Sequence, residues 1–446
     1  MKKPEIRLSD HFTYGRLFRF VLPSVIMMVF TSIYGVVDGI FISNFAGSVP
    51  FAGVNLILPF VMIFSTVGFM FGTGGSALVA KVMGEGQAEK ARRIFSLLIY
   101  VLIGVGLLFT VLGEIFLPAV ARAFGAEGDL LDYAIRYGRI SFLSLTPFML
   151  QNTFQSFLNT AERPKLGLLI TVGAGLANII LDAVFVGALG LSVEGAAAAT
   201  AVSECLGGFL PLIFFLSRNK SPLRLTRPEK DLRCLLLTCT NGASEFMTNV
   251  SMSFVNMLYN IRLLELAGEN GVAAYGVIMY ISFIFVAIYI GYAMGSAPIV
   301  SYHYGAGNTD ELKNMFRMSH RIILVISLAM LALSEVTASL IAGIYVGYDG
   351  ALYDLTVRAI QIYSTSYLFA GYNIFGSAFF TALNNGKISA LISFVRVLLF
   401  QLVCILILPI FWGADGIWAS LPVSEIFSVL VAYICLRRYR RVYSYA

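Results

Sequence analysis

The 446-residue chain is 58% hydrophobic and only 13% charged, and its net charge is +6 at pH 7. A soluble fold cannot hide this much apolar surface, because its exterior must be largely polar. The composition therefore excludes an ordinary cytosolic enzyme, a nucleic-acid-binding protein and a disordered chain. It predicts an all-α polytopic membrane protein.

Apolar runs bounded by charged residues or Gly/Pro clusters predict twelve membrane spans. Each run is long enough for a helix of about 20 residues to cross a bilayer. In chain order the predicted spans cover residues 20–44, 54–80, 94–118, 136–160, 166–189, 195–217, 235–262, 272–301, 322–346, 359–383, 389–411 and 416–436.

The distribution of basic residues predicts the orientation of these spans. Of the 31 Lys and Arg residues, 25 lie in the two tails and the even-numbered loops, whereas five lie in the odd-numbered loops and Arg396 lies within a span. Because cytoplasmic loops carry an excess of Lys and Arg, both termini are predicted to be cytoplasmic, in a multi-pass protein of the plasma membrane. The basic N-terminal tail lacks the short apolar core of a signal peptide, so none is expected.

The chain repeats itself at a nearly constant offset. Residues 195–204 resemble residues 416–425, an offset of 221, and the spacing between Phe157 and Lys165 recurs between Phe379 and Lys387 at an offset of 222. Each half contains six predicted spans, so the halves share one orientation. We therefore predict two pseudo-symmetric six-helix bundles around a central cavity, with a substrate site between them. The predicted domains are residues 1–217, a basic linker at 218–233, and residues 234–446.

Acidic residues inside spans are costly and usually functional. Some acids recur in both halves and are interpreted as structural; these are Glu114, Glu335, Glu204 and Glu425. Asp38, Asp182 and Glu245 have no acidic counterpart at the equivalent position of the other half. For Asp38 and Asp182 this asymmetry favours a functional role. For Glu245 a functional and a structural role are equally favoured.

Asp182 has oxygen-bearing neighbours that suit a cation. Asn178 lies four residues earlier, on the same helix face. Thr200 approaches if the fifth and sixth spans pack antiparallel through their short connecting turn. Carboxylate, amide and hydroxyl oxygens suit a transient Na⁺, or a proton on Asp182. The alternative is an Asn–Asp hydrogen bond that fixes two helices to each other.

The fourth span carries a stripe of amides, namely Gln151, Asn152, Gln155 and Asn159. This stripe is predicted to avoid lipid and face the bundle interior or a wet cavity, where it either binds substrate or joins helices. Four further side chains are candidates for a soft pocket for flat cationic compounds, with core packing as the alternative; they are Phe154, Met252, Tyr259 and Tyr280.

Proline and glycine positions add two expectations. Pro23 predicts a kink in the first span, which is either a hinge below Asp38 or a static bend. Gly68, Gly72, Gly74 and Gly75 predict close helix contacts in the second span. The five cysteines form no CxxC pair and are predicted to be unpaired thiols. No Walker, HExxH or GxSxG motif occurs, so no enzyme activity, cofactor or permanent metal site is expected.

Taken together, these motifs resemble the multidrug and toxin extrusion (MATE) family of secondary transporters. The resemblance covers essentially the whole chain and is carried by Pro23, Tyr34-x3-Asp38, Asn178-x3-Asp182 and Pro298-x6-Gly305-Ala306-Gly307. Residues 241–246 and 271–277 are similar to its MepA-like bacterial branch. The resemblance implies that Asp38, Asn178, Asp182 and Thr200 bind the coupling cation. It further implies that the amides Gln151, Asn152 and Gln155 line a substrate pocket. Some members have a second carboxylate site in the C-terminal lobe, of which Glu245 would form part, but Asn373 stands where an Asp is expected. Tyr34, Glu245 and Asn373 are also among the candidate substrate-binding residues.

The resulting hypothesis is a monomeric antiporter that exports amphipathic, often cationic compounds in exchange for H⁺ or Na⁺. It needs no cofactor, and its partners are small substrates and membrane lipid. One alternative is a flippase for a lipid-linked substrate, which would need a cationic cavity although Arg396 is the only basic residue clearly within a span. A second alternative is a membrane scaffold or receptor that transports nothing.

Overall fold

The computed structural model describes residues 6–42, 45, 47–228 and 231–446. Within these residues the chain forms helices and no strand. The helices of the first half are α1 (Tyr14–Phe41), α2 (Ser48–Gly84), α3 (Ala88–Ala123), α4 (Gly128–Leu143), α5 (Leu145–Thr160), α6 (Pro164–Asp182), η2 (Ala183–Ala188) and α7 (Ser192–Leu216). Those of the second half are α8 (Leu232–Gly305), α9 (Thr309–Val346), α10 (Gly350–Ser364), α11 (Tyr367–Ala382), α12 (Gly386–Phe394), η3 (Val395–Leu399), α13 (Phe400–Trp412) and α14 (Ala414–Tyr443).

These helices make up the twelve predicted spans. Helix α8 contains the seventh and eighth spans, because the chain reverses at Gly268, whose φ of 62° and ψ of −157° suit only glycine. The fourth span is divided into α4 and α5 at Ser144, and the tenth into α10 and α11. The fifth and eleventh spans each contain a π-helical stretch, η2 and η3. The prediction of an all-α membrane fold is confirmed.

Nine helices of the described chain are long and apolar enough to cross a membrane. One of them is α8, which crosses twice. The fourth and tenth spans are missing from this set because each is divided into two helices of 15 or 16 residues, shorter than a bilayer-crossing helix of about 20 residues.

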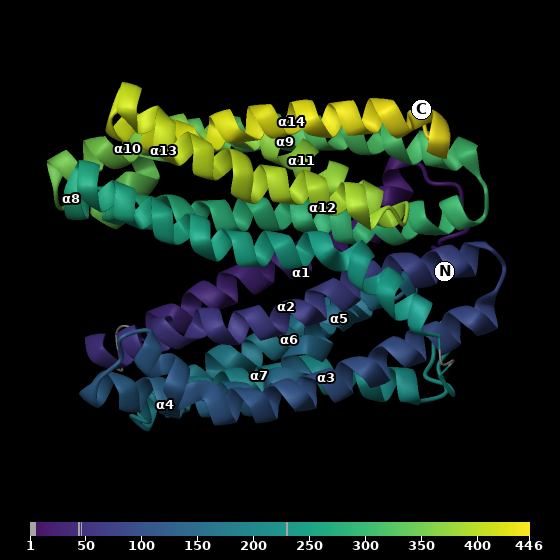
Figure 1. Ribbon diagram of the computed structural model, residues 1–446, viewed down its shortest axis with the longest axis horizontal. Helices are drawn as coiled ribbons and strands as arrows, with labels where there is room; N and C mark the ends of the chain where they lie inside the picture. The colour runs from purple at the N-terminus through teal and green to yellow at the C-terminus, as the bar shows by residue number, and fades with distance from the viewer. Residues whose placement is uncertain (1–5, 43–44, 46, 229–230) are drawn as a thin grey trace.

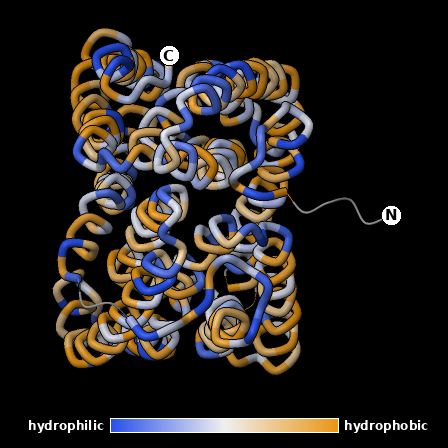
Figure 2. Tube along the Cα trace, turned by 90° about the vertical axis from the view of Figure 1, so that its right-hand side faces the viewer, coloured by the Kyte–Doolittle hydropathy of each residue, from blue (hydrophilic) through white to orange (hydrophobic). Residues whose placement is uncertain are grey.

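The spans gather into two bundles, α1–α7 and α8–α14, which we call the first and second lobes (Figure 1). Both termini lie at the right-hand end in Figure 1, which we call the terminal end, and the ribbons of the lobes diverge toward the opposite end. Seen from the terminal end, the two lobes lie one above the other, and hydrophobic residues dominate their helices (Figure 2). The loops at the terminal end are the even-numbered, basic ones.

Glycines bring the two lobes into backbone contact. A side chain at Gly84 of α2 would collide with the carbonyl oxygen of Tyr302 in α8, and one at Gly305 would collide with that of Lys81. Midway along α2, a side chain at Gly74 would overlap the backbone of α8 at Gly242. The predicted close approach at the glycine cluster of the second span is therefore confirmed. These contacts join the lobes from the middle of α2 to the terminal end.

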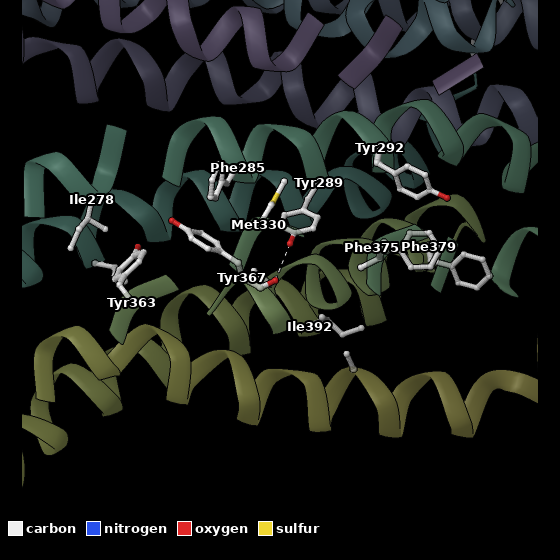
Figure 3. Close-up of a cluster of buried hydrophobic side chains, with 14 of the residues drawn as sticks. Ile278, Phe285, Tyr289, Tyr292, Met330, Tyr363, Tyr367, Phe375, Phe379 and Ile392 are labelled. Carbon is white, nitrogen blue, oxygen red and sulfur yellow. Dashed lines mark hydrogen bonds between the residues drawn. The ribbon is translucent and has the colours of Figure 1, made fainter. Parts of the chain in front are cut away.

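The two lobes have differently built cores. The first lobe packs phenylalanines, with the ring centroid of Phe95 4.8 Å from that of Phe157 and 4.9 Å from that of Phe215. The second lobe buries several tyrosines whose hydroxyls find internal partners (Figure 3), although the hydroxyl of Tyr259 finds none among the described residues. The Tyr289 hydroxyl, for example, donates to the Tyr367 carbonyl oxygen at 2.9 Å. Hydrogen bonds of this kind satisfy polar groups that are buried in the core.

A segment before α1 connects the lobes at the terminal end. The backbone N–H of Leu8 donates to Glu162 of the first lobe at 2.8 Å. The N–H of Phe12 donates to Glu311 of the second lobe at 3.0 Å, and the His11 ring contacts the same carboxylate at 2.6 Å. Leu8 and Phe12 are both fully buried. We call residues 6–13 the N-terminal strap.

Candidate cation site and substrate-facing residues

Three residues of the predicted cation set come together where α6 meets α7. Asp182 is the last residue of α6, directly before the π-helical stretch η2, and its side chain is completely buried. Asn178, one turn earlier, donates from its amide to the Thr200 hydroxyl of α7 at 3.3 Å. π-Helical turns widen a helix and are frequent at functional sites.

Asp38 reaches this group from α1. Its carboxyl group lies within hydrogen-bonding reach of the Asp182 carboxyl, and it also accepts from the Thr200 hydroxyl. Both carboxylate oxygens of Asp182 and Oδ1 of Asp38 find no donor among the described residues. The four predicted cation residues thus lie together. Their contacts leave three carboxylate oxygens and the Asn178 amide oxygen free to accept a proton or coordinate a cation.

A third acid, Glu204 of α7, faces the same region. It is hydrogen-bonded to Ser144, and its charge acts on both Asp38 and Tyr34. Sequence symmetry had placed Glu204 with Glu425 as a structural residue. The structure instead puts it beside the asymmetric acids, which could not be foreseen because its sequence match to Glu425 says nothing about its neighbours.

The amide stripe of α5 is buried, as predicted, with 1–5% of each side chain exposed. Gln151 hydrogen-bonds the Tyr34 hydroxyl, next to the acids. Asn159 accepts from Ser24 of α1 at 2.8 Å, which joins two helices. Oε1 of Gln151 and Nδ2 of Asn152 have no partner among the described residues. The end of the stripe nearest the acids therefore retains unused hydrogen-bonding capacity.

The second lobe carries a different ionic cluster, which includes Glu425, the repeat counterpart of Glu204. Arg396, within the π-helical stretch η3, donates from Nε and Nη2 to the Glu425 carboxylate at 2.8 Å. Asn373 of α11 donates to the same carboxylate. Glu425 is 1% exposed, so this is a buried and fully paired ion pair. The sequence identified Arg396 as an intramembrane base and Glu425 as structural, but no spacing in the sequence predicted that they pair.

The other predicted pocket residues are spread over both lobes. Phe154 is fully buried in the first lobe's core and stacks on Phe215 at 5.5 Å. Tyr259 is buried and stacks on Tyr275 at 5.0 Å. Tyr280 is 41% exposed and stacks on Tyr345. Glu245 and Met252 are half-buried on α8, and Glu245 lies within electrostatic reach of Arg396. The structure does not gather these side chains into one pocket.

No cluster of three or more His, Cys, Asp or Glu residues that could hold a metal ion occurs in the part of the chain that the structure describes. The five cysteines are free thiols, as predicted. Pro23 lies inside the continuous helix α1, nearer to the start of that helix than Asp38. The chemistry of the site therefore rests on carboxyl, amide and hydroxyl oxygens.

Comparison with known proteins decides the family. The MatE family profile matches residues 23–184 and, a second time, residues 246–407, which together make up more than half of the chain. The chain belongs to the MatE family. The two matches begin 223 residues apart, close to the offset of the internal repeat. Membership of the MatE family makes the chain a secondary membrane transporter and not an enzyme.

Similar proteins of the MatE family match over nearly the whole chain. The "Multidrug export protein MepA" of Staphylococcus haemolyticus (strain JCSC1435) is 25% identical over 94% of this chain and 93% of its own length. MepA of Staphylococcus aureus (strain MRSA252) is 24% identical over the same shares. A solved structure described as the outward-facing conformation of a multidrug resistance MATE family transporter has a TM-score of 0.91 at 21% identity, and covers 96% of each chain.

Proposed function

We propose that this MatE protein is a cation-coupled antiporter that exports amphipathic, often cationic compounds across the cell membrane, with both termini in the cytoplasm. The observation that carries the proposal is the contact between the carboxyl groups of Asp38 and Asp182. No Lys or Arg of the described chain pairs with either. Two carboxylates in contact repel each other unless a proton or a metal cation lies between them.

The pair couples to a conformational change because its members lie on different helices. Asp38 is one turn from the end of α1, and Asp182 ends α6. A proton or Na⁺ between them draws the two helices together, assisted by Asn178 and Thr200, and its loss lets them separate. Pro23 provides the hinge in α1, because proline frees a backbone carbonyl inside a helix. If the bound cation weakens substrate binding by some factor, then thermodynamic linkage requires the bound substrate to weaken cation binding by the same factor.

The arrangement of the lobes supports release on the outer side. Backbone contacts of α2 with α8 at Gly84 and Gly305 join the lobes at the terminal end, which the basic loops assign to the cytoplasm. The substrate then meets the free amides of Gln151 and Asn152 and the Tyr34 hydroxyl on the first lobe. Gln155, Glu245, Met252, Tyr259, Tyr280 and Asn373 are the further proposed contacts, and a negative cavity wall favours cationic compounds.

The flippase alternative is less well supported. A phosphate-bearing lipid needs a free positive charge in the cavity, but the guanidinium of Arg396 is already paired with Glu425 at 2.8 Å. The scaffold or receptor alternative does not explain the carboxyl groups of Asp38 and Asp182. These groups lie within the spans without a basic partner among the described residues, and such groups are costly inside a membrane.

The proposal is tested by following ethidium efflux from proteoliposomes of the full-length protein under an imposed pH gradient, an imposed Na⁺ gradient, or neither. We expect one gradient to drive efflux and its collapse by an ionophore to stop it. Efflux at an equal rate with no gradient would contradict coupling, and no efflux under any condition would favour the scaffold.

A further inference from the structure

We propose that a basic cleft at the terminal end is a binding site for the phosphate headgroup of an anionic membrane phospholipid. The cleft has a volume of about 890 Å³ and lies between the N-terminal strap, α1, α3, the turn before α6 and the linker before α8. Six cationic side chains line it, namely Arg7, Arg16, Arg19, Arg92, Arg163 and Lys220. The inference rests on the orientation proposed above, in which this end faces the cytoplasm.

The cationic side chains of the cleft outnumber its two acids, Asp10 and Glu162, although Arg92 is also paired with Glu89. Asp10 accepts from the backbone N–H of Arg7 at 3.1 Å, and Glu162 accepts from that of Leu8 at 2.8 Å. Both carboxylates thus hold the strap in place. Burial raises the pKa of Glu162, while its bond to Leu8 and the charges of Arg7 and Arg163 oppose that rise. Of the six cations, Arg7 and Arg163 are thus within electrostatic reach of this carboxylate.

The cleft is more than the general excess of basic residues at a cytoplasmic face. Arg92 is fixed by its bonds to the Pro222 carbonyl oxygen and to Glu89, both at 2.8 Å, and Arg16 donates to the His11 carbonyl oxygen at 3.0 Å. Arg92 is thus held by the linker and by its own helix, and Arg16 is held by the strap. Prearranged guanidinium groups bind phosphate more strongly than mobile surface charges do.

The surroundings favour a lipid over a soluble phosphate compound. The cleft lies at the ends of α1, α3 and α6, which belong to segments long and apolar enough to cross a membrane. Leu169 of α6, which packs on α1, is 70% exposed. A cationic hollow at the end of membrane-spanning helices accepts a charged headgroup while the acyl chains lie along the apolar surface of those helices. Basic pockets of this kind on the cytoplasmic side of membrane proteins bind anionic lipid headgroups.

Such a lipid would join two parts of the chain. Arg7 belongs to the strap and Arg16 and Arg19 to the start of α1, whereas Arg92, Arg163 and Lys220 belong to the rest of the first lobe. The strap in turn bonds Glu311 of the second lobe through Phe12 and His11. An anionic headgroup in the cleft therefore stabilises the arrangement in which the two lobes are joined at the terminal end.

The test measures thermal unfolding of the purified full-length protein in neutral detergent, with added dioleoylphosphatidylglycerol, dioleoylphosphatidylcholine or free glycerol 3-phosphate. We expect phosphatidylglycerol to raise Tm by about 5 °C and the other two to have little effect. In the double variant Arg16→Gln/Arg19→Gln, at least half of this shift should be lost. The charge-matched control is Arg440→Gln/Arg441→Gln, whose arginines are exposed on α14 outside the cleft, and it should keep the full shift.

A second variant covers the case in which the first does not fold. Lys220 is exposed on the linker, so Lys220→Gln should leave the fold intact and reduce phosphatidylglycerol binding, counted by native mass spectrometry. An equal shift with glycerol 3-phosphate would assign the cleft to a soluble phosphate. If both cleft variants kept the full Tm shift with phosphatidylglycerol, the proposed site would be wrong. Because the assay involves no transport, it gives its answer even if the antiport proposal fails.

Discussion

The two lobes place different ionic groups within the same set of helices, although not at equivalent positions of the repeat. In the first lobe, Asp38 and Asp182 meet next to the π-helical stretch η2, with no basic partner. In the second lobe, Arg396 within the π-helical stretch η3 neutralises Glu425. The second lobe thus carries the basic group that neutralises its acid, whereas the two acids of the first lobe have no basic partner among the described residues. We infer that the repeated fold uses one lobe for coupling and the other as a fixed support.

The largest expected effect concerns Glu425 and its counterpart in the repeat, Glu204. Glu425→Gln removes the carboxylate that is hydrogen-bonded to the Arg396 guanidinium and leaves only the more distant Glu245 as a counter-charge, so it should cost about 3 kcal/mol of stability and lower the Tm of the purified protein. Glu204→Gln, the matched change in the first lobe, breaks no ion pair in the described structure and should leave Tm nearly unchanged.

A neutral replacement of the whole pair sharpens this prediction. The double variant Arg396→Met/Glu425→Leu should recover most of the Tm lost in Glu425→Gln, because apolar groups replace both charges. It should also still export ethidium. If the double variant folds but transports nothing, then the second lobe takes part in coupling and the division between the lobes is wrong.

The next effect is on transport rather than stability. Asp182→Asn or Asp38→Asn removes one of the two carboxylates that need a cation, so gradient-driven ethidium efflux should fall by about 100-fold while Tm is maintained. Efflux rates in proteoliposomes under the driving gradient give the measurement. Wild-type efflux in Asp182→Asn would disprove the proposed cation site.

The smallest effect comes from one hydroxyl. Thr200 corresponds to Leu421 at the repeat offset, so Thr200→Val makes the first lobe resemble the second at this point. Loss of the hydrogen bond to Asp38 should weaken cation binding about 5-fold, or about 1 kcal/mol, seen as a shift in the cation concentration for half-maximal efflux. Ser420→Ala, which removes a hydroxyl from the equivalent helix, is the control and should shift nothing.

Much of the architecture could be predicted from the sequence, because hydrophobicity and charge are strong and local signals. The twelve spans and the repeat followed from them, and the asymmetry of the acids pointed to Asp38 and Asp182. The contact between Asn178 and Thr200 also followed, since a short turn forces neighbouring spans to pack antiparallel.

Features that depend on contacts between distant segments could not be predicted. The pairing of Arg396 with Glu425 joins spans whose relative rotation is set by packing, not by spacing in the sequence. The position of Glu204 near Asp38 depends on the same rotations. The N-terminal strap was also missed, because residues such as Leu8 and Phe12 in a basic tail give no periodic signal, although both are fully buried.

The reversal at Gly268 has a consequence for how the chain enters the bilayer. Helix α8 has 74 residues, about 110 Å of helix, yet no polar loop separates its two spans. The turn carries the charged residues Arg262, Glu265 and Glu269, and in the proposed orientation they cross the membrane during synthesis. Because the turn between the two spans of α8 is so short, we expect the two spans to enter the lipid together, as one helical hairpin. Insertion of the second lobe then starts from the helix that later contacts the first.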